Sequence, residues 1–385
     1  MSTEELALPR RVTSSQPQQA EQRQGRDARH SPRRDTTEKT SNGPSPRRSS
    51  LSTPSSTSSP PRLDESHPFL EPTYPVLSTC SLLIFATIWG VLARLGLEWL
   101  GTFAESKVFA IVWAQIVGCL VMGFVTERKK EIDSIFPPFF TMLGTGFCGS
   151  LTTWSTMAED TFVAFANLDQ PTGTSRFTGF LSGVSVTLIT LFASMCALEF
   201  GVHLDSFLPS LSPSRRLPRR ISHHHTKTLL NHSTILLGPL FWLGSLFLLI
   251  FGPPSYRSRA TFAIVFGPFG TVLRYTLSTH LNSLSPSFPL GTFLSNTLAT
   301  LLISLISLFS RHPNSPLSCS ALKGLNDGLC GSLSTISTFV VELRKLKRGE
   351  SYRYFGVTWV TSQGFLVVVL GSWVWSGNRM GVCWS

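Results

Sequence analysis

The sequence predicts an all-α integral membrane protein with nine transmembrane helices, arranged as two inverted four-helix repeats joined by a linker helix. Three observations lead to this prediction. Charged residues make up only 14% of the 385 positions, whereas soluble proteins carry about a quarter. Beyond residue 75 the chain consists of long apolar runs separated by charged or turn-rich segments. The first half of this apolar region also matches the second half in order and spacing.

The first 75 residues are rich in Ser, Pro, Arg and Gln and contain almost no aliphatic clusters. Such a segment cannot bury enough apolar surface to offset its conformational entropy, so a disordered cytoplasmic tail is predicted. It starts without an apolar h-region, which argues against a cleavable signal peptide. Its Arg- and Ser-rich stretch would also fit a transit peptide, but six acidic residues among the first 38 positions argue against that alternative.

Nine later ranges are apolar over about the 20 residues that a spanning helix needs. These ranges are 76–99, 107–126, 137–159, 177–204, 234–252, 260–280, 289–310, 318–342 and 354–375. The loops between them, with the adjoining helix ends, carry 13 Lys and Arg on one side of the membrane and 6 on the other. Because cytoplasmic loops carry the basic excess, the N-terminus is predicted to be cytoplasmic and the C-terminus extracellular.

Three features recur in the same order at an offset of 180 to 182 residues. GVLAR at 90–94 recurs as GTVLR at 270–274, CGSLTTWST at 148–156 recurs as CGSLSTIST at 330–338, and Gln115 stands opposite Asn296. Such a repeat indicates two homologous halves. Because a single helix separates two halves of four helices each, the second half enters the membrane from the opposite side.

The predicted divisions follow from this repeat. They are a tail (1–75), a first repeat (76–204), a basic loop with the inverting helix (205–259), a second repeat (260–376) and a C-terminal tail (377–385).

Cysteine usage and net charge exclude other classes of protein. The seven cysteines lie mostly inside apolar segments without CxxC spacing, so neither a disulfide framework nor a zinc site is indicated. The net charge of +11 resides in the tail and loops, where it sets membrane topology, so the lipid bilayer is the expected partner and nucleic acid is not.

The third helix of each repeat carries a polar run at mid-membrane depth. The two runs are Gly149-Ser150-Leu151-Thr152-Thr153 and Gly331-Ser332-Leu333-Ser334-Thr335. Non-helical backbone is tolerated in a membrane only where protein buries it or where it lines a polar cavity. A break in each helix is therefore predicted, and its carbonyl oxygens would suit a small cation between the halves. The alternative is that the small residues only allow close helix packing.

Other polar side chains lie in matching or one-sided positions. Arg94 and Arg274 are interpreted as attracting an anion at each vestibule, or alternatively as snorkelling to the interface. Gln115 and Asn296 would serve as pore donors or as interhelical hydrogen bonds. Hydroxyl stripes, which can replace water around a small anion, are expected at Tyr354, Thr358, Thr361 and Ser362, and at Thr178, Ser182, Ser185 and Thr187.

The segments 146–156 and 328–339 resemble the third-helix signature of the fluoride channel (CrcB/Fluc) family. The nine-helix layout looks like the fused, two-domain eukaryotic fluoride exporters, over about residues 76–376. The resemblance implies passive, fluoride-selective export across the plasma membrane by a single chain that acts as a pseudo-dimer. It also implies a structural sodium ion, held by the backbone carbonyls of Gly149, Thr152, Gly331 and Ser334.

The resemblance further places pore-lining side chains at Trp154, Met157, Ile336 and Phe339. Only the second half keeps the family's asparagine (Asn296), so one working pore and one degenerate pore containing Gln115 are predicted. The full predicted ion pathway comprises Asn296, Gln115, Phe339, Ile336, Trp154, Met157, Thr153, Thr335, Ser155, Ser337, Arg94, Arg274, Tyr354, Thr358 and Ser362.

A proton-coupled secondary transporter with inverted repeats is the main alternative. It would need a titratable relay inside the membrane, for which the candidates are Glu98, Glu159, Asp160, Asp327 and Glu342. A non-transporting scaffold would not explain the paired polar runs. An enzyme is not expected, because no nucleophile–base pair or metal-binding cluster recurs.

Overall fold

A computed structural model describes residues 75–102, 109–168, 175–207, 224–312, 315–377 and 383. All of them belong to one compact unit of the chain, residues 65–385. The predicted disordered tail lies outside the described residues, apart from Pro75 at the start of the first helix.

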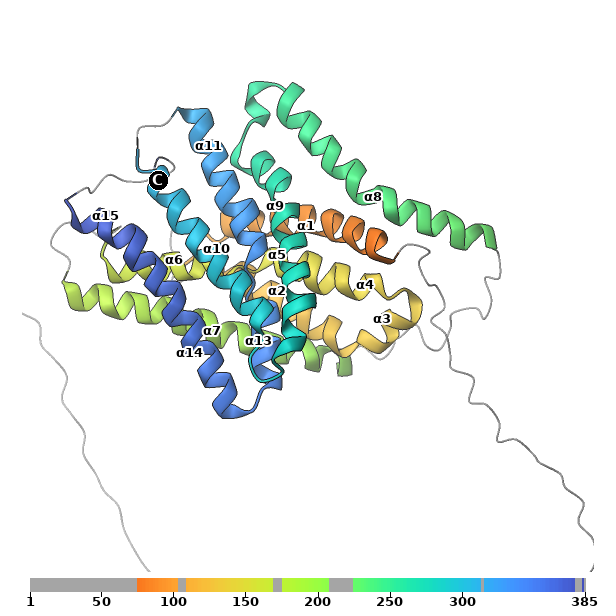
Figure 1. The fold of residues 1–385 in the computed structure, drawn as a ribbon, viewed down its shortest axis with the longest axis horizontal. Helices are drawn as coiled ribbons and strands as arrows, with labels where there is room; N and C mark the ends of the chain where they lie inside the picture. The colour runs from red at the N-terminus through yellow and green to blue at the C-terminus, as the bar shows by residue number, and fades with distance from the viewer. Residues whose placement is uncertain are drawn as a thin grey trace, which may run out of the picture. The chain divides into compact units, whose positions relative to one another are not determined.

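The first half is entirely helical where it is described (Figure 1). Its elements are α1 (Pro75–Leu100), α2 (Ile111–Glu127), α3 (Lys129–Ile135), α4 (Pro138–Thr141), the π-helical turn η1 (Met142–Cys148), α5 (Gly149–Leu151), α6 (Trp154–Phe165) and α7 (Arg176–Phe207). The axes of α2 and α3 differ in direction by 71°, and Arg128 lies at the bend between them. The Arg128 side chain forms an ion pair with Asp205 of α7. Elements α4 to α6 together occupy the range predicted for the third helix.

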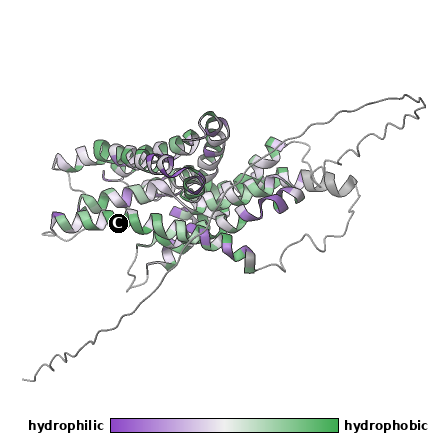
Figure 2. Ribbon diagram, turned by 90° about the horizontal axis from the view of Figure 1, so that it is seen from below, coloured by the Kyte–Doolittle hydropathy of each residue, from purple (hydrophilic) through white to green (hydrophobic). Residues whose placement is uncertain are grey.

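The second half repeats this order after the linker helix α8 (His224–Phe251). Its elements are η4 (Pro254–Tyr256), α9 (Arg259–Leu281), η5 (Asn282–Leu284), α10 (Leu290–Phe309), α11 (Pro316–Leu325), η6 (Asn326–Cys330), α12 (Gly331–Leu333), α13 (Ser337–Lys345), α14 (Arg348–Leu366), η7 (Val367–Gly371) and α15 (Ser372–Trp375). Figure 2 shows that apolar residues predominate along these helices, as lipid-facing and core positions both require.

Six described helices are long and apolar enough to cross a bilayer, and the bent pair α2–α3 would make a seventh. The predicted count of nine is therefore not confirmed for the described residues. The third and eighth predicted ranges are interrupted, and their longest uninterrupted pieces, α6 and α13, contain only 12 and 9 residues. Such pieces are too short to span a bilayer alone.

Glycines bring the broken helices close to α1 and α9. A Cβ atom at Gly90 of α1 would lie 2.7 Å from the Phe147 carbonyl oxygen, and one at Gly270 of α9 would collide with the Leu329 carbonyl oxygen. These two contacts are related by the sequence repeat. The halves meet where Thr271 contacts Thr87 and Ser150, each at 2.8 Å between hydroxyl oxygens.

The linker helix α8 packs against the outside of the first half. The Gly238 main-chain N–H donates to the Ser81 hydroxyl of α1 over 2.9 Å, and a Cβ at Gly238 would collide with the Ser81 carbonyl. Farther along α8, Leu240, Phe247 and Phe251 are exposed, which fits a lipid-facing surface.

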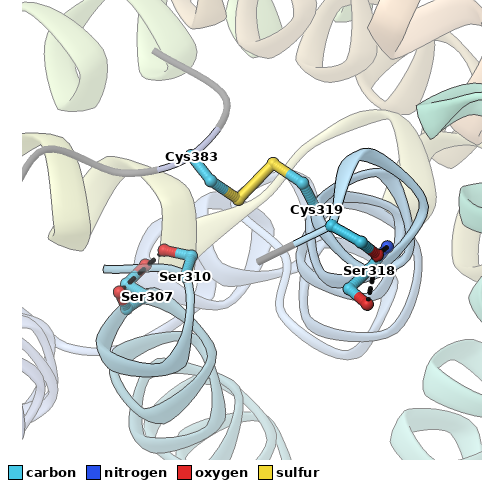
Figure 3. Close-up of a disulfide and its surroundings, with 6 residues drawn as sticks. Ser307, Ser310, Ser318, Cys319 and Cys383 are labelled. Atoms are coloured by element: carbon cyan, nitrogen blue, oxygen red, sulfur yellow. Dashed lines mark hydrogen bonds between the residues drawn. A yellow bond between two sulfur atoms is a disulfide. The ribbon is translucent and has the colours of Figure 1, made fainter. Parts of the chain in front are cut away.

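A disulfide joins Cys319 of α11 to Cys383 in the C-terminal tail (Figure 3). The sequence analysis indicated no disulfide framework, and for this pair that was wrong. The two residues are 64 positions apart, so no local spacing reveals them, yet their Cα atoms lie 5.9 Å apart, within the normal disulfide range. The Cys383 main-chain N–H also donates to the Ser310 carbonyl at the end of α10.

Candidate ion pathway

Both polar runs break their helices as predicted. In the first half Thr152 and Thr153 are extended (φ −99°, ψ 147° and φ −142°, ψ 129°), and α6 begins directly after them. In the second half Ser334 is extended (φ −89°, ψ 161°) before α13 begins. The alternative of close packing alone is therefore wrong for these runs, because their backbone leaves the helix.

The hydroxyls of each break cap the helix of the other half. The Ser334 hydroxyl accepts from the Ser155 main-chain N–H at 3.0 Å, and the Thr152 hydroxyl accepts from the Ser337 main-chain N–H at 3.0 Å. Each of these N–H groups lies in the first turn of a helix, where no intrahelical partner is available. The two breaks are therefore cross-capped.

Further hydroxyl contacts close this junction. Thr153 lies 3.0 Å from Ser334, and Thr335 lies 3.2 Å from Thr152, both between hydroxyl oxygens. Ser155 and Ser337 contact the same two partners, at 2.9 and 3.0 Å. All six side chains are fully buried. Four of the predicted pathway hydroxyls, those of Thr153, Ser155, Thr335 and Ser337, are thus brought together at the contact between the two halves.

The carbonyl set predicted for sodium is compatible with a hard cation. Because Thr152 and Ser334 are extended, their carbonyls do not follow the direction of helical hydrogen bonds, and main-chain oxygens are ligands that hard cations prefer. Within the described residues no group of three His, Cys, Asp or Glu side chains could hold a metal instead. The sodium ion itself stays a prediction.

The two arginines are buried inside the protein, 1% and 2% exposed. Arg94 donates to the Asp327 carbonyl, and Arg274 donates to the carbonyls of Thr145 and Ser332 at 2.8 and 2.9 Å. Snorkelling is therefore wrong for both, and neither guanidinium lies in an open vestibule. Each arginine crosses to the other half, where it occupies the space that a Cβ atom would need at Gly331 or Gly149.

The two amide residues make equivalent contacts. Gln115 donates to the Thr153 carbonyl at 2.7 Å and accepts from the Thr153 N–H at 3.3 Å. Asn296 donates to the Thr335 carbonyl at 3.2 Å and accepts from the Thr335 N–H at 2.8 Å. Both amides are fully buried, so each holds the extended backbone of a break in its own half.

An aromatic and hydroxyl track runs along α14. The rings of Trp154 and Phe339 lie 4.6 Å apart, and those of Phe339 and Tyr354 lie 4.7 Å apart. The Trp154 indole N–H donates to the Ser362 hydroxyl at 2.9 Å. Thr358 lies between Tyr354 and Ser362 on the same buried face. This track joins α14 to both broken helices.

The other predicted side chains divide between this track and its surroundings. Met157 and Ile336 are buried in the same apolar cluster as Trp154 and Phe339. Thr361 is only partly buried, beside the track residue Ser362. The predicted stripe of the fourth range does not form one buried face, since Thr178 and Ser185 of α7 are exposed while Thr187 is buried.

Two partly buried carboxylates make side-chain hydrogen bonds near the ends of the broken helices, and the sequence analysis considered them only as proton-relay candidates. Glu342 accepts from the hydroxyls of Tyr354 and Thr292, at 2.8 and 2.7 Å. Glu159 accepts from the Ser307 hydroxyl of α10. Glu159 follows its polar run by six residues and Glu342 follows its own by seven, and that was the signal available in the sequence.

The Gln115 side differs from the Asn296 side. There α2 and α7 pack so closely that a Cβ atom at Gly123 would collide with the Leu198 carbonyl, and one at Gly201 with the Leu120 carbonyl. Beyond the N-terminal end of α2 lies a cavity of about 570 Å³ whose lining includes Thr156, Glu98, Asp160, Arg259, Lys323 and Asp327. We refer to it as the charged cavity.

Comparison with known proteins shows which family the chain resembles. The sequence pattern of CrcB-like proteins (Camphor Resistance, CrcB) matches the chain twice, at residues 81–202 and 261–372. Fluoride export protein 1 of Neurospora crassa is 32% identical over 78% of this chain and 67% of that protein, and its Candida albicans namesake is 32% identical over 80% and 83%. The fluoride-specific ion channel FluC of Escherichia coli is 34% identical over 29% of this chain and 96% of that protein.

No solved structure is detectably similar to the chain. The repeat found in the sequence coincides with the two matches, and together these matches cover more than half of the chain. The chain therefore belongs to the CrcB family and carries two CrcB domains in one polypeptide.

Proposed function

We propose that this protein is a passive, fluoride-selective membrane channel that exports fluoride from the cytoplasm and thereby gives fluoride resistance. Relatives from fungi are called fluoride export proteins, and a bacterial relative is called a fluoride-specific ion channel. The observation that carries the proposal is the buried track of Tyr354, Thr358 and Ser362 beside Trp154 and Phe339. Hydroxyl groups and positive ring edges are suited to replace water around a small anion.

The conducting pathway is assigned to the Asn296 side. There the hydroxyl face of α14 runs between the two broken helices, and Asn296 retains a second amide hydrogen beyond its contact with Thr335. On the Gln115 side α7 also buries hydroxyls, those of Thr187, Thr190 and Ser194, but α2 packs so closely against α7 that a Cβ atom at Gly123 or Gly201 would collide with the facing backbone. One pore then conducts, and the other is degenerate.

A sodium ion at the cross-capped junction would have a structural role. The carbonyls of Gly149, Thr152, Gly331 and Ser334 would hold it, and its charge would fix the extended backbone of both breaks. With both CrcB domains in one polypeptide, a single chain would complete the unit as a pseudo-dimer.

The N-terminus is assigned to the cytoplasm, the C-terminus to the extracellular side and the protein to the plasma membrane. The distribution of basic residues supports this orientation. The Cys319–Cys383 disulfide supports it independently, because disulfides persist on the oxidising side of the plasma membrane and are rare in the cytosol. The charged cavity then opens to the outside.

Fluoride efflux from liposomes tests the function. Purified protein is reconstituted into vesicles loaded with fluoride or chloride, and release is followed with ion-selective electrodes. We expect rapid fluoride release, little chloride release and no requirement for a proton gradient. Equal release of chloride would contradict selectivity, and no release would contradict the channel.

The alternative is a proton-coupled transporter, which the partly buried Glu342 beside Tyr354 favours. A carboxylate that is hydrogen-bonded inside a membrane pathway is a group that proton relays use. In the same vesicles, release that stops when the proton gradient is collapsed would establish this alternative in place of the channel.

A further inference from the structure

The two buried arginines make equivalent contacts in the two halves. Arg94 donates to the carbonyl of Asp327, and Arg274 donates to the carbonyl of Thr145. Asp327 and Thr145 are themselves related by the offset of 182 residues that relates the two polar runs. Any difference between the surroundings of the two guanidinium groups is therefore a real asymmetry between the two ends of the molecule.

Arg94 lies among acidic side chains. Its guanidinium is 4.0 Å from Glu98, which also pairs with Arg259 at 2.8 Å. Arg259 pairs in addition with Asp327, which lies 3.5 Å from Lys323. Asp160 lines the same charged cavity. This end of the molecule therefore holds three basic and three acidic side chains, namely Arg94, Arg259 and Lys323 with Glu98, Asp327 and Asp160. The formal charge at this end is therefore balanced.

Arg274 has no such surroundings. The positions equivalent to those of the other four members of the Arg94 network all carry hydroxyls, namely Ser278 for Glu98, Thr79 for Arg259, Thr141 for Lys323 and Thr145 for Asp327. Within the part of the chain that the structure describes, no acidic side chain lies within 4.0 Å of Arg274. Its hydrogen bonds go to main-chain carbonyls, which leave its charge uncancelled.

A buried charge without a counter-ion acts over a longer range than an ion pair. Its field is weakly screened by the protein, whereas balanced charges cancel beyond a short distance. In the proposed orientation Arg274 lies in the cytoplasmic half of the junction and Arg94 in the extracellular half. The electrostatic attraction for an anion is then stronger from the cytoplasm than from outside.

We propose that this charge asymmetry makes conduction directional, with Arg274 drawing fluoride into the pathway from the cytoplasmic side while the ion-pair network cancels the equivalent attraction of Arg94. The inference rests on the proposed fluoride channel and its orientation. Where ion entry limits the current, a single uncancelled charge acting over a distance of about 15 Å in a medium of effective dielectric about 20 changes anion entry about sixfold. Outward fluoride flux should exceed inward flux by roughly that ratio.

The test is a current–voltage measurement on inside-out membrane patches with equal fluoride on both sides, where the orientation of the protein is known. The wild-type ratio of outward to inward fluoride flux at mirrored voltages is expected to be about six. Ser278→Glu places a carboxylate one helical turn from Arg274, as Glu98 is placed from Arg94, and should lower the ratio toward one. Ser278→Gln is the matched control of equal size and should leave the ratio unchanged.

Glu98→Gln provides a second test that does not depend on adding a carboxylate at the half-buried Ser278 position. It leaves the extracellular end more positive and should also lower the ratio. A wild-type ratio near one, equal effects of Ser278→Glu and Ser278→Gln, or an unchanged ratio in Glu98→Gln would each overturn the inference. Absence of any fluoride current would instead contradict the proposed channel.

Discussion

Replacing Asn296 and Gln115 separately by alanine distinguishes a structural role from an ion-conducting role. Each amide makes two hydrogen bonds with the backbone of the break in its own half. Each alanine variant loses these bonds, at about 1 kcal/mol apiece, and leaves two buried main-chain groups unpaired, at about 1–3 kcal/mol each. The two variants should therefore be destabilised to a similar extent, by several kcal/mol.

Fluoride flux should separate the two variants. A hydrogen bond to a charged partner contributes about 1.5–3 kcal/mol, so loss of one donor to fluoride should slow conduction about ten- to a hundredfold. We expect Asn296→Ala to show this loss in liposome efflux, and Gln115→Ala to keep flux close to that of the wild type. Thermal unfolding in detergent supplies the control for stability.

Comparable loss of flux in both variants would refute the assignment of one working pore. Loss in Gln115→Ala alone would place the pore on the other side. The isosteric variant Asn296→Asp serves as a further control, because it retains the shape of the side chain but puts an acceptor in place of the amide donor. It should therefore block conduction, and normal flux would contradict the donor role.

Three further predictions concern the junction, the track and the disulfide. Gly331→Ala puts a methyl group where the Arg94 guanidinium lies. It should lower the stability measured by thermal unfolding by about 1–3 kcal/mol, as small-to-large changes in packed cores do. Gly356→Ala, whose methyl group meets open space, should be tolerated in the same assay. Tyr354→Phe removes the hydroxyl donor to Glu342 and should cost about 1–3 kcal/mol because that carboxylate loses a buried partner, so unchanged thermal stability would contradict the contact. Cys319→Ser should lower stability by about 2–4 kcal/mol through loss of the cross-link, and the double variant with Cys383→Ser should match it; a greater loss in the double variant would show that the cysteines act separately.

Features that repeat in the sequence were predictable. The helix breaks followed from polar runs at mid-membrane depth. The equivalence of Arg94 and Arg274 followed from the constant offset between the two repeats. What these arginines contact could not be predicted, because each crosses to the other half, and only the tertiary packing brings Gly331 against Arg94. The same limit applied to Gln115, whose role in holding Thr153 depends on where α2 lies.

Features that do not repeat were the hardest to predict. Cys383 lies beyond the second repeat and has no counterpart in the first, so no comparison within the chain identified its partner. The ion-pair network around Arg94 has charges where the equivalent positions around Arg274 have hydroxyls, and the repeat therefore did not single out Glu98 or Arg259. The hydroxyl stripe predicted for α7 failed for a different reason, since the spacing of Thr178 and Ser185 does not specify which side of a helix faces lipid.

The cross-capping of the two breaks has a consequence for biogenesis. The Ser155 N–H in the first turn of α6 finds its acceptor in Ser334, which is synthesised about 180 residues after it, and the Ser337 N–H of α13 depends on Thr152. Until the second half is inserted, the Ser155 N–H in the third helix of the first half lacks this partner, which a lipid environment strongly disfavours. Insertion of that half is therefore complete only after the second half has arrived from the ribosome, and a chain truncated before Ser334 would be a substrate for membrane quality control.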